Sequence, residues 1–178
     1  PDWCIHCSGL EPVESRHQLV LDLSRAEVVD NLFGQLSRLL AENDISYVKW
    51  DFNRNLTDNG SAFLAPGRQG EHAHRYMLGA YELMRRLNAE FPHVIFENCA
   101  SGSGRGDLEM DRYFSRINRS DNQDTLDILD IQEGFTYLHH PRSAGGGCQI
   151  SRSYSYFFNH REIPLRFMAH VAMMGWPS

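Results

Sequence analysis

Polar and apolar side chains alternate along YVKWDFNRN, residues 47–55. Successive side chains of an extended chain point to opposite faces, so this pattern predicts a strand over residues 45–52 with two different faces. One face carries three polar side chains, those of Lys49, Asp51 and Asn53. The other carries three apolar side chains, those of Val48, Trp50 and Phe52. If the polar face meets water, the strand is ordinary and holds a solvated Lys–Asp pair; if it lines a cavity, it is a binding site.

The segments around this strand alternate between strand and helix patterns. Short apolar runs predict three further strands, at residues 18–24, 93–99 and 114–121. Apolar residues at helical spacing predict a helix over about 25–42, where Ser24 and Glu27 would form a capping box. A second helical pattern is marked by Met77, Ala80, Tyr81, Met84 and Leu87.

This alternation bounds the fold class. Strands separated by helices favour a parallel sheet, and the unit length is near the roughly 30 residues of one unit in a (β/α)8 barrel. No internal repeat or linker is visible, and the chain opens on Pro1 rather than on Met. We therefore expect an α/β fold in which residues 1–178 form a single segment of a partial (β/α)8 TIM barrel, cut from a longer chain and without flanking domains. Such a half barrel would expose unpaired sheet edges, so we expect the segment to be inactive by itself.

Composition narrows the classes of partner. Lys and Arg number 17 against 23 Asp and Glu, the formal net charge is −6, and no basic cluster is present. A nucleic-acid partner is therefore not expected, and a neutral substrate fits better. No apolar run approaches the roughly 20 residues of a membrane helix, and nothing at the start reads as a signal peptide. We expect no membrane association and a cytoplasmic location.

The sharpest metal-binding pattern is C-I-H-C at residues 4–7. A zinc site would need two more ligands at a matched spacing, and His139 and His140 are poor candidates because adjacent side chains diverge. The alternative is a short strand with one buried face, formed by Trp3, Ile5 and Cys7. We favour this structural interpretation and predict neither a metal nor a cofactor.

In a parallel barrel, polar groups gather at the carboxyl ends of the strands. Three further polar residues end predicted strands: Asn98, Cys99 and Asp121. Asp51 and Asp121 would then share one cavity. Two carboxyl groups, one ionised as a nucleophile and one protonated to donate to the leaving oxygen, suit cleavage of a glycosidic bond. Lys49 and an arginine such as Arg16 or Arg105 would keep Asp51 charged. The assignment is not unique, because other acids lie near predicted strand ends: Asp22, Asp58, Glu97, Asp107 and Asp124.

Three motifs, KWDFNRN, ENCASGSGRGD and RSDNQD, preceded by RHQLVLDLS, resemble the α-galactosidases of glycoside hydrolase family 36 in order and separation. The resemblance runs from about Pro1 to Met174. It implies a retaining (β/α)8 enzyme that hydrolyses terminal α-galactosides of the melibiose and raffinose type through a galactosyl-enzyme intermediate. The aspartate of the KWD motif, Asp51, would be the nucleophile, and that of the SDN motif, Asp121, would be the acid/base. The implied partner is an α-galactoside oligosaccharide, and we expect the full-length protein to form a homo-oligomer.

The same resemblance implies roles for residues around the two acids. Six fall on or beside sugar-contact positions: Arg16, Lys49, Asn53, Cys99, Ser101 and Gly102. Three others would support the site: Trp50, Arg105 and Asp107. The alternative for the glycines of residues 100–107 is a role in tight turns alone.

The chain also departs from the family pattern. Ile128 stands where the family has an arginine, and the segments SAGGGCQIS (143–151) and MMGWPS (173–178) are altered. Contacts on the leaving-group side are therefore expected to differ, and the paired aspartates that the family carries on an earlier strand are missing. Two alternatives stay open: a galactosyl transferase of raffinose-synthase type and a non-catalytic carbohydrate-binding relative. Hydrolysis and transfer share one covalent intermediate, so the residues do not separate them.

Overall fold

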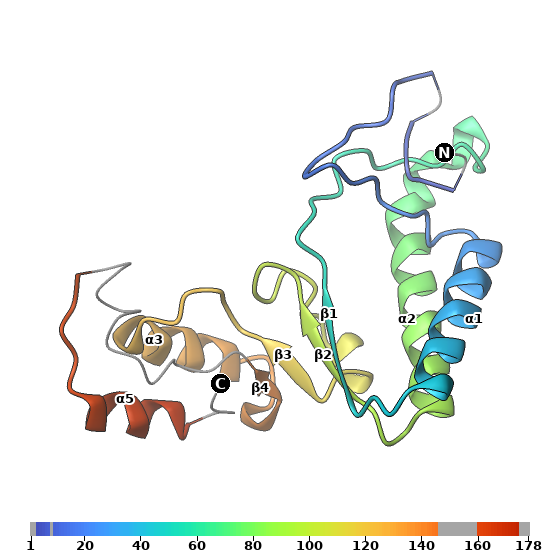
Figure 1. The fold of residues 1–178 in the computed structure, drawn as a ribbon. Coiled ribbons are helices and arrows are strands. Elements are labelled where there is room, and N and C mark those ends of the chain that lie inside the picture. Colours follow the sequence, from blue (N-terminus) through green and yellow to red (C-terminus); the bar gives the residue numbers. More distant parts are fainter. Residues whose placement is uncertain (1–2, 8, 146–159, 175–178) are drawn as a thin grey trace. The chain divides into compact units, whose positions relative to one another are not determined.

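The computed structural model describes residues 3–7, 9–145 and 160–174, and the chain forms two compact units (Figure 1). The first unit consists of Pro1–Ser46 and Arg54–Val94, and the second consists of Tyr47–Asn53 and Ile95–Ser178. The strand that carries the KWD motif therefore belongs with the C-terminal half of the chain.

The second unit is built on a parallel sheet. Within the described residues its strands are β1 (Tyr47–Asp51), β2 (Ile95–Cys99), β3 (Arg116–Asn118) and β4 (Ala144–Gly145), side by side in that order (Figure 1). Each neighbouring pair is parallel. A sheet order that follows chain order is the winding of a (β/α)8 barrel, whereas a doubly wound sheet reverses its order at a switch point. The predicted α/β fold with a partial barrel is confirmed.

The strands are shorter than the predicted ones at residues 45–52, 93–99 and 114–121. β3 is shortened most, because the backbone leaves the sheet after Asn118. Asp121 therefore lies in the loop after β3 rather than on the strand itself.

The strand register gives the sheet one polar face. Lys49 pairs with Glu97, and Asp51 pairs with Cys99. Because alternate residues share a face, the side chains on it are those of Tyr47, Lys49, Asp51, Glu97, Cys99, Arg116 and Asn118. The opposite face carries Phe96 and Ile117, which are buried. Exposure along β1 alternates in the predicted way, since its polar-face residues are exposed and the two between them are half-buried.

Helix α3 (Thr125–Thr136) packs on the sheet through Phe135, which contacts Ile117 of β3 and Ala144 of β4. Helix α5 (Leu165–Ala172) packs against α3. Their shared core contains Ile128, Ile163, Met168, Val171 and Ala172. Two short 3-10 helices complete the unit: η2 (Met110–Arg112) and η3 (Pro141–Ser143). Ile128, which departs from the family pattern, is therefore a core residue.

The first unit is held by two helices, α1 (Ala26–Glu42) and α2 (His72–Glu90), which pack along each other (Figure 1). The 3-10 helix η1 (Pro66–Glu71) leads into α2. Gly79 lets α2 approach the preceding chain closely, since a Cβ there would lie 1.8 Å from the carbonyl oxygen of Leu23. None of the helices that the structure describes combines the length and apolarity needed to cross a membrane.

The predicted capping box at the start of α1 is wrong. Arg25 is the N-cap residue and makes no side-chain capping hydrogen bond. Ser24 Oγ instead donates to Asp22 Oδ1 at 2.6 Å, and Glu27 accepts from the Arg25 guanidinium at 2.8 Å. Ser24 and Glu27 therefore bind neighbouring side chains, those of Asp22 and Arg25, and do not form the capping box.

The predicted strand over residues 18–24 is also wrong. An antiparallel bridge joins Leu21 to Cys4, so this segment pairs with the N-terminal residues and is not part of the parallel sheet. Only Ile5 is buried among the residues of the predicted buried face, Trp3, Ile5 and Cys7.

Candidate active site

Two carboxylates lie at the carboxyl ends of neighbouring strands of the second unit. Asp51 ends β1 and Cys99 ends β2, and the Cys99 thiol is hydrogen-bonded to the Asp51 carboxylate. Nδ2 of Asn118, the last residue of β3, donates to Cys99 Sγ at 3.3 Å. The same Nδ2 donates to Oδ1 of Asp121 at 3.0 Å. The structure therefore places both carboxylates in one hydrogen-bond network that runs across three adjacent strand ends.

Asn53 joins the loop after β2 to the same network. Its Nδ2 donates to Oδ2 of Asp51 at 2.7 Å, and its Oδ1 accepts from the backbone N and Oγ of Ser101 at 3.2 and 3.0 Å. Ser101 has a left-handed φ of 50°, a conformation that a residue other than glycine keeps only when its contacts hold it. The two hydrogen bonds to Asn53 are such contacts.

Gly102 lets this loop approach the SDN motif. Its φ is +91°, and a Cβ at this position would lie 3.0 Å from the Cα of Ser120. Both the left-handed backbone and the close approach require glycine. The loop after β2 thereby lies against the residue that precedes Asp121.

The electrostatics of the network favour an ionised Asp51. Burial of its carboxyl group favours the neutral form, but hydrogen bonds from the Cys99 thiol and the Asn53 amide, together with the Lys49 charge, outweigh it. They hold the pKa of Asp51 below its ordinary value. Asp51 is therefore a carboxylate at neutral pH, as a nucleophile must be.

Arg105 and Asp107 support the backbone around the site. Arg105 Nη2 donates to the carbonyl oxygens of Trp50 and Cys99 at 2.9 and 3.0 Å, and its guanidinium lies 5.1 Å from the centre of the Phe52 ring. Asp107 Oδ1 accepts from two backbone N–H groups at the start of η2. The structure gives Arg105 this role at the backbone, in which Trp50 takes part through its carbonyl oxygen, and the expectation that Arg105 keeps Asp51 ionised stays a prediction.

Arg16 belongs to the first unit, at the tip of a two-residue hairpin. Ser15 and Gln18 exchange two backbone hydrogen bonds, at 3.3 and 3.1 Å. Arg16 and His17 between them have φ of 55° and 58°, which is the type I′ geometry that usually selects asparagine or glycine. The buried side chain of Arg54 donates to backbone carbonyls on both sides of the turn. The contact of Arg16 with a sugar stays a prediction.

Comparison with known proteins decides the family. The melibiase family model matches residues 1–176. The chain belongs to the melibiase family. It is 45% identical over 178 residues to α-galactosidase AgaA of Geobacillus stearothermophilus and 48% identical over 143 residues to α-galactosidase 1 of Pediococcus pentosaceus. These alignments cover 98% and 80% of this chain but only 24% and 19% of the two relatives.

Solved structures agree with this membership of the melibiase family. The crystal structure of GH36 α-galactosidase AgaA from Geobacillus stearothermophilus matches with a TM-score of 0.89 at 41% identity, over 98% of this chain and 24% of that one. AgaB from the same organism matches with a TM-score of 0.90 at 40% identity. The resemblance to family 36 is thus confirmed, and the chain spans about a quarter of the length of these relatives.

The other acids near strand ends of this melibiase-family chain have structural partners. Asp124 caps the N-terminus of α3 and pairs with an arginine. Asp22 is buried and accepts hydrogen bonds from serine and histidine side chains of the first unit. Glu97 accepts from a tyrosine, and Asp58 accepts from a backbone N–H group. None of these contacts involves Asp51 or Asp121.

Asn118 is the member of the network that the motifs do not reveal. It precedes the SDN motif and belongs to none of the quoted family positions. One signal could have found it, since Asn118 is the polar end of the buried run Ile117–Asn118, just as Cys99 ends β2. The predicted strand runs on to residue 121, so the sequence does not show that β3 ends at Asn118 or which face of the sheet carries its side chain.

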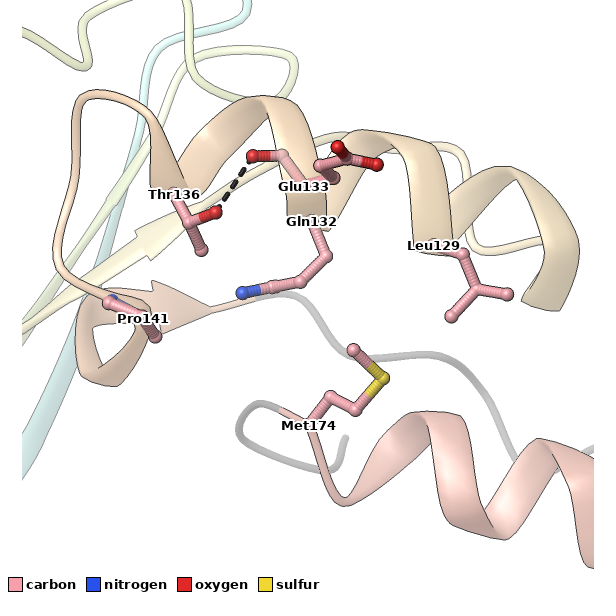
Figure 2. A pocket seen from close by; sticks show the side chains of 6 residues that line it. All are labelled: Leu129, Gln132, Glu133, Thr136, Pro141 and Met174. Carbon is pink, nitrogen blue, oxygen red and sulfur yellow. Dashed lines mark hydrogen bonds between the residues drawn. The ribbon is translucent and has the colours of Figure 1, made fainter.

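A cavity of about 570 Å³ lies elsewhere in the second unit, between α3, η3 and the residues after α5 (Figure 2). It is lined by Leu129, Gln132, Glu133, Thr136, Pro141 and Met174. Neither Asp51 nor Asp121 lines it, so it is distinct from the candidate active site.

The C-I-H-C pattern has backbone contacts in the structure. His6 Nδ1 lies 3.2 Å from the carbonyl oxygen of Cys4, and a Cβ at Gly60 would lie 2.8 Å from Cys7 Sγ. Over residues 3–7, 9–145 and 160–174, no group of three His, Cys, Asp or Glu side chains is placed to hold a metal ion. Residues 146–151 of the altered SAGGGCQIS segment and 175–178 of MMGWPS lie outside the described residues.

Proposed function

We propose that this chain supplies both catalytic carboxylates of a retaining α-galactosidase that hydrolyses terminal α-galactosides of the raffinose and melibiose type. The observation that carries the proposal is the network from Asp51 through Cys99 and Asn118 to Asp121. It gathers two carboxyl groups at the carboxyl ends of parallel strands, where enzymes of the (β/α)8 fold place their catalytic residues.

The proposed reaction is a double displacement. Asp51 attacks the anomeric carbon while Asp121 donates its proton to the departing glycosidic oxygen, and a galactosyl ester of Asp51 forms. Asp121, now a carboxylate, takes a proton from water, and the resulting hydroxide attacks the anomeric carbon and releases Asp51. The two inversions return the α configuration. The lowered pKa of Asp51 supports the first step, because it keeps the nucleophile ionised.

Two solved complexes of AgaA support the assignment of the acids. The complex with stachyose carries an aspartate-to-alanine substitution, and the complex with raffinose carries an aspartate-to-asparagine substitution. The interval between these two positions equals the interval between Asp51 and Asp121. Substituting a catalytic acid is a direct way to keep an intact oligosaccharide bound. The match therefore supports both the residues and the class of substrate.

The remaining predicted site residues receive proposed roles around these acids. Lys49 and Asn53 flank the nucleophile, and we assign both to galactose hydroxyls as well as to the charge state of Asp51. Cys99, Ser101 and Gly102 follow β2 beside the acids, and the assignment of Arg16 to the sugar rests on the motif resemblance alone. Trp50, Arg105 and Asp107 support the backbone.

Product analysis of the full-length protein on raffinose and melibiose tests the proposal. Proton NMR should show free galactose formed first as the α anomer. A longer oligosaccharide as the main product would instead establish a galactosyl transferase, and initial β-galactose would exclude retention. Binding of raffinose without turnover would indicate a non-catalytic carbohydrate-binding protein.

A further inference from the structure

Asn118 lies between the two proposed catalytic carboxylates. Its side chain is 6% exposed, and its Nδ2 lies 3.3 Å from Cys99 Sγ and 3.0 Å from Asp121 Oδ1. We propose that Asn118 is a positioning residue that holds Asp121 for proton transfer and aims the Cys99 thiol at Asp51. This inference rests on the proposed function.

The chemistry of the amide explains why this residue suits the position. A primary amide nitrogen carries two hydrogens, and here each meets one acceptor, a thiol sulfur and a carboxylate oxygen. The opposite orientation of the amide would turn its oxygen toward the Asp121 carboxylate, which has no hydrogen to donate once it is ionised, and would take up the Cys99 S–H that otherwise donates to Asp51. Because an asparagine does not titrate, Asn118 donates in both protonation states of Asp121.

The Asn118 donor also gives the Cys99 thiol a direction. A sulfur that accepts from Asn118 leaves its own S–H free to donate to the Asp51 carboxylate. Asn118 thus acts on the nucleophile indirectly, through Cys99, and on the acid/base directly. The proposed nucleophile and the proposed acid/base are therefore both linked to the same neutral donor, the Asn118 amide.

Asn118 is fixed on a strand, whereas the acid that it holds lies on a loop. Asn118 pairs with Gly145 of β4 in the sheet, and Arg119 N donates to Gly145 O at 3.3 Å. Asp121 is exposed and comes after β3 ends. A donor on a rigid element that orients a loop carboxylate is the arrangement that keeps an acid/base in its productive geometry.

The test compares two leaving groups in the full-length protein. Asn118→Leu removes both donors at similar volume and should lower kcat/KM on raffinose about 10- to 100-fold, the range for a hydrogen bond to a charged group. On 4-nitrophenyl α-galactoside the loss should be about threefold or less, because nitrophenolate departs with little protonation. Asn118→Asp, which keeps the shape of asparagine, should show the same dependence and replaces Asn118→Leu if that variant does not fold.

A double-mutant cycle separates positioning from general structural damage. In an Asp121→Ala background, Asn118→Leu should lower kcat/KM on raffinose by no more than about threefold, the loss expected on the aryl galactoside, because only its indirect effect on Asp51 through Cys99 remains. Asn98→Ala is the matched control, since this buried amide of β2 donates to Arg105 O at 2.9 Å rather than to either acid. Its losses should be equal on the two substrates.

Equal losses of Asn118→Leu and Asn118→Asp on the two substrates would overturn the inference, as would a full additional loss in the Asp121→Ala background. The Asp121→Ala variant itself should lose far more on raffinose than on the aryl galactoside, and azide should rescue it with retained configuration. If Asp121→Ala instead loses equally on both substrates, the acid/base assignment fails, and the role of Asn118 fails with it.

Discussion

Asp51 takes its charge state from neighbours that are mostly neutral. A thiol and an amide donate to it, and one ammonium lies on the same face of β1. Neutral donors stabilise a carboxylate without forming an ion pair that a neutral sugar would have to displace. The nucleophile is therefore ionised before substrate arrives.

Replacement of Asp51 tests the covalent step directly. Asp51→Ala should lower kcat by about four orders of magnitude or more, as expected when the residue that forms a covalent intermediate is removed. Added azide should restore turnover and give the β-galactosyl azide, because only one displacement then occurs. The measurement is the rate on 4-nitrophenyl α-galactoside with product configuration by NMR. A rate within about tenfold of wild type would remove Asp51 from this role.

Replacement of Cys99 should change the pH dependence of the reaction. The thiol lowers the pKa of Asp51, so Cys99→Ala should raise that pKa, and the nucleophile should stay protonated up to a higher pH. The acid limb of kcat/KM against pH should therefore move to higher pH. Cys99→Ser, which keeps a hydroxyl donor, is the matched control and should move it less. An acid limb that stays in place or moves to lower pH in Cys99→Ala would contradict this account.

At the scale of elements, α3 begins directly after the RSDNQD motif, which ends at Asp124. Asp124 is its N-cap: the side chain is fully buried, accepts from two backbone N–H groups and pairs with Arg161 at 2.5 Å. Arg161 belongs to the segment that precedes α5. The Asp124 carboxylate therefore caps the start of α3 and also links it to the chain that leads into α5. The cap explains why the acid nearest to Asp121 in sequence is structural.

Two substitutions of Asp124 should separate the cap from the ion pair. Asp124→Ala removes both and should lower the free energy of unfolding by about 2–3 kcal/mol, a value reduced because Arg161 is partly exposed. Asp124→Asn keeps a capping oxygen and should cost about 1 kcal/mol. Chemical denaturation measures both. The ratio of kcat/KM on raffinose to that on the aryl galactoside should stay at its wild-type value; a selective loss on raffinose would transfer the acid/base role to Asp124.

The predicted elements succeed where one strong pattern dominates and fail where a side chain has a competing partner. The helix predicted over 25–42 forms as α1 (Ala26–Glu42) because the apolar periodicity is long, and YVKWD forms a strand because its two faces differ. The capping box fails because Asp22 binds Ser24. The strand over 18–24 fails because a short apolar run does not specify its partner, and here Leu21 forms an isolated antiparallel bridge with Cys4. Motifs located the acids, but only the shortened β3 reveals Asn118.

At the scale of the whole second unit, the polar face of the sheet contains two groups of different purpose. Near the carboxyl ends lies the network of Asp51 and Asp121. Nearer the amino ends, Glu97 accepts a hydrogen bond from Tyr47 and lies 3.5 Å from Arg116 Nε. In barrels of this kind, catalytic groups belong at the carboxyl ends of the strands and stabilising groups at the amino ends. The face of this sheet follows that division.

The amino-end group yields a prediction about stability that is separate from catalysis. Glu97 is 6% exposed, and removal of its carboxylate takes away the acceptor of Tyr47 and the counter-charge of Arg116. Glu97→Ala should therefore lower the free energy of unfolding by about 1–3 kcal/mol. The ratio of kcat/KM on the two substrates should not change, because the carboxyl-end network keeps its donors. A selective loss on raffinose would contradict the division between the two ends.

The alkaline side of the stability profile tests the same group independently. Partial burial of the hydroxyl, followed by the hydrogen bond to Glu97 and its charge, raises the pKa of Tyr47 to about 12 from 10.0. A pKa that is higher in the folded state gives a contribution to stability that is present below pH 10.0 and is lost as the pH rises toward 12. Urea denaturation at neutral pH and at about pH 11 should show a smaller alkaline loss in Glu97→Ala than in wild type. Tyr47→Phe is the matched control, because it removes the titrating hydroxyl while the Glu97–Arg116 pair remains, and it should show the smallest loss of the three proteins, since Glu97→Ala leaves the burial of Tyr47 in place. An alkaline loss in both variants equal to that of wild type would exclude Tyr47 as its source and leave Glu97 as a partner of Arg116 alone.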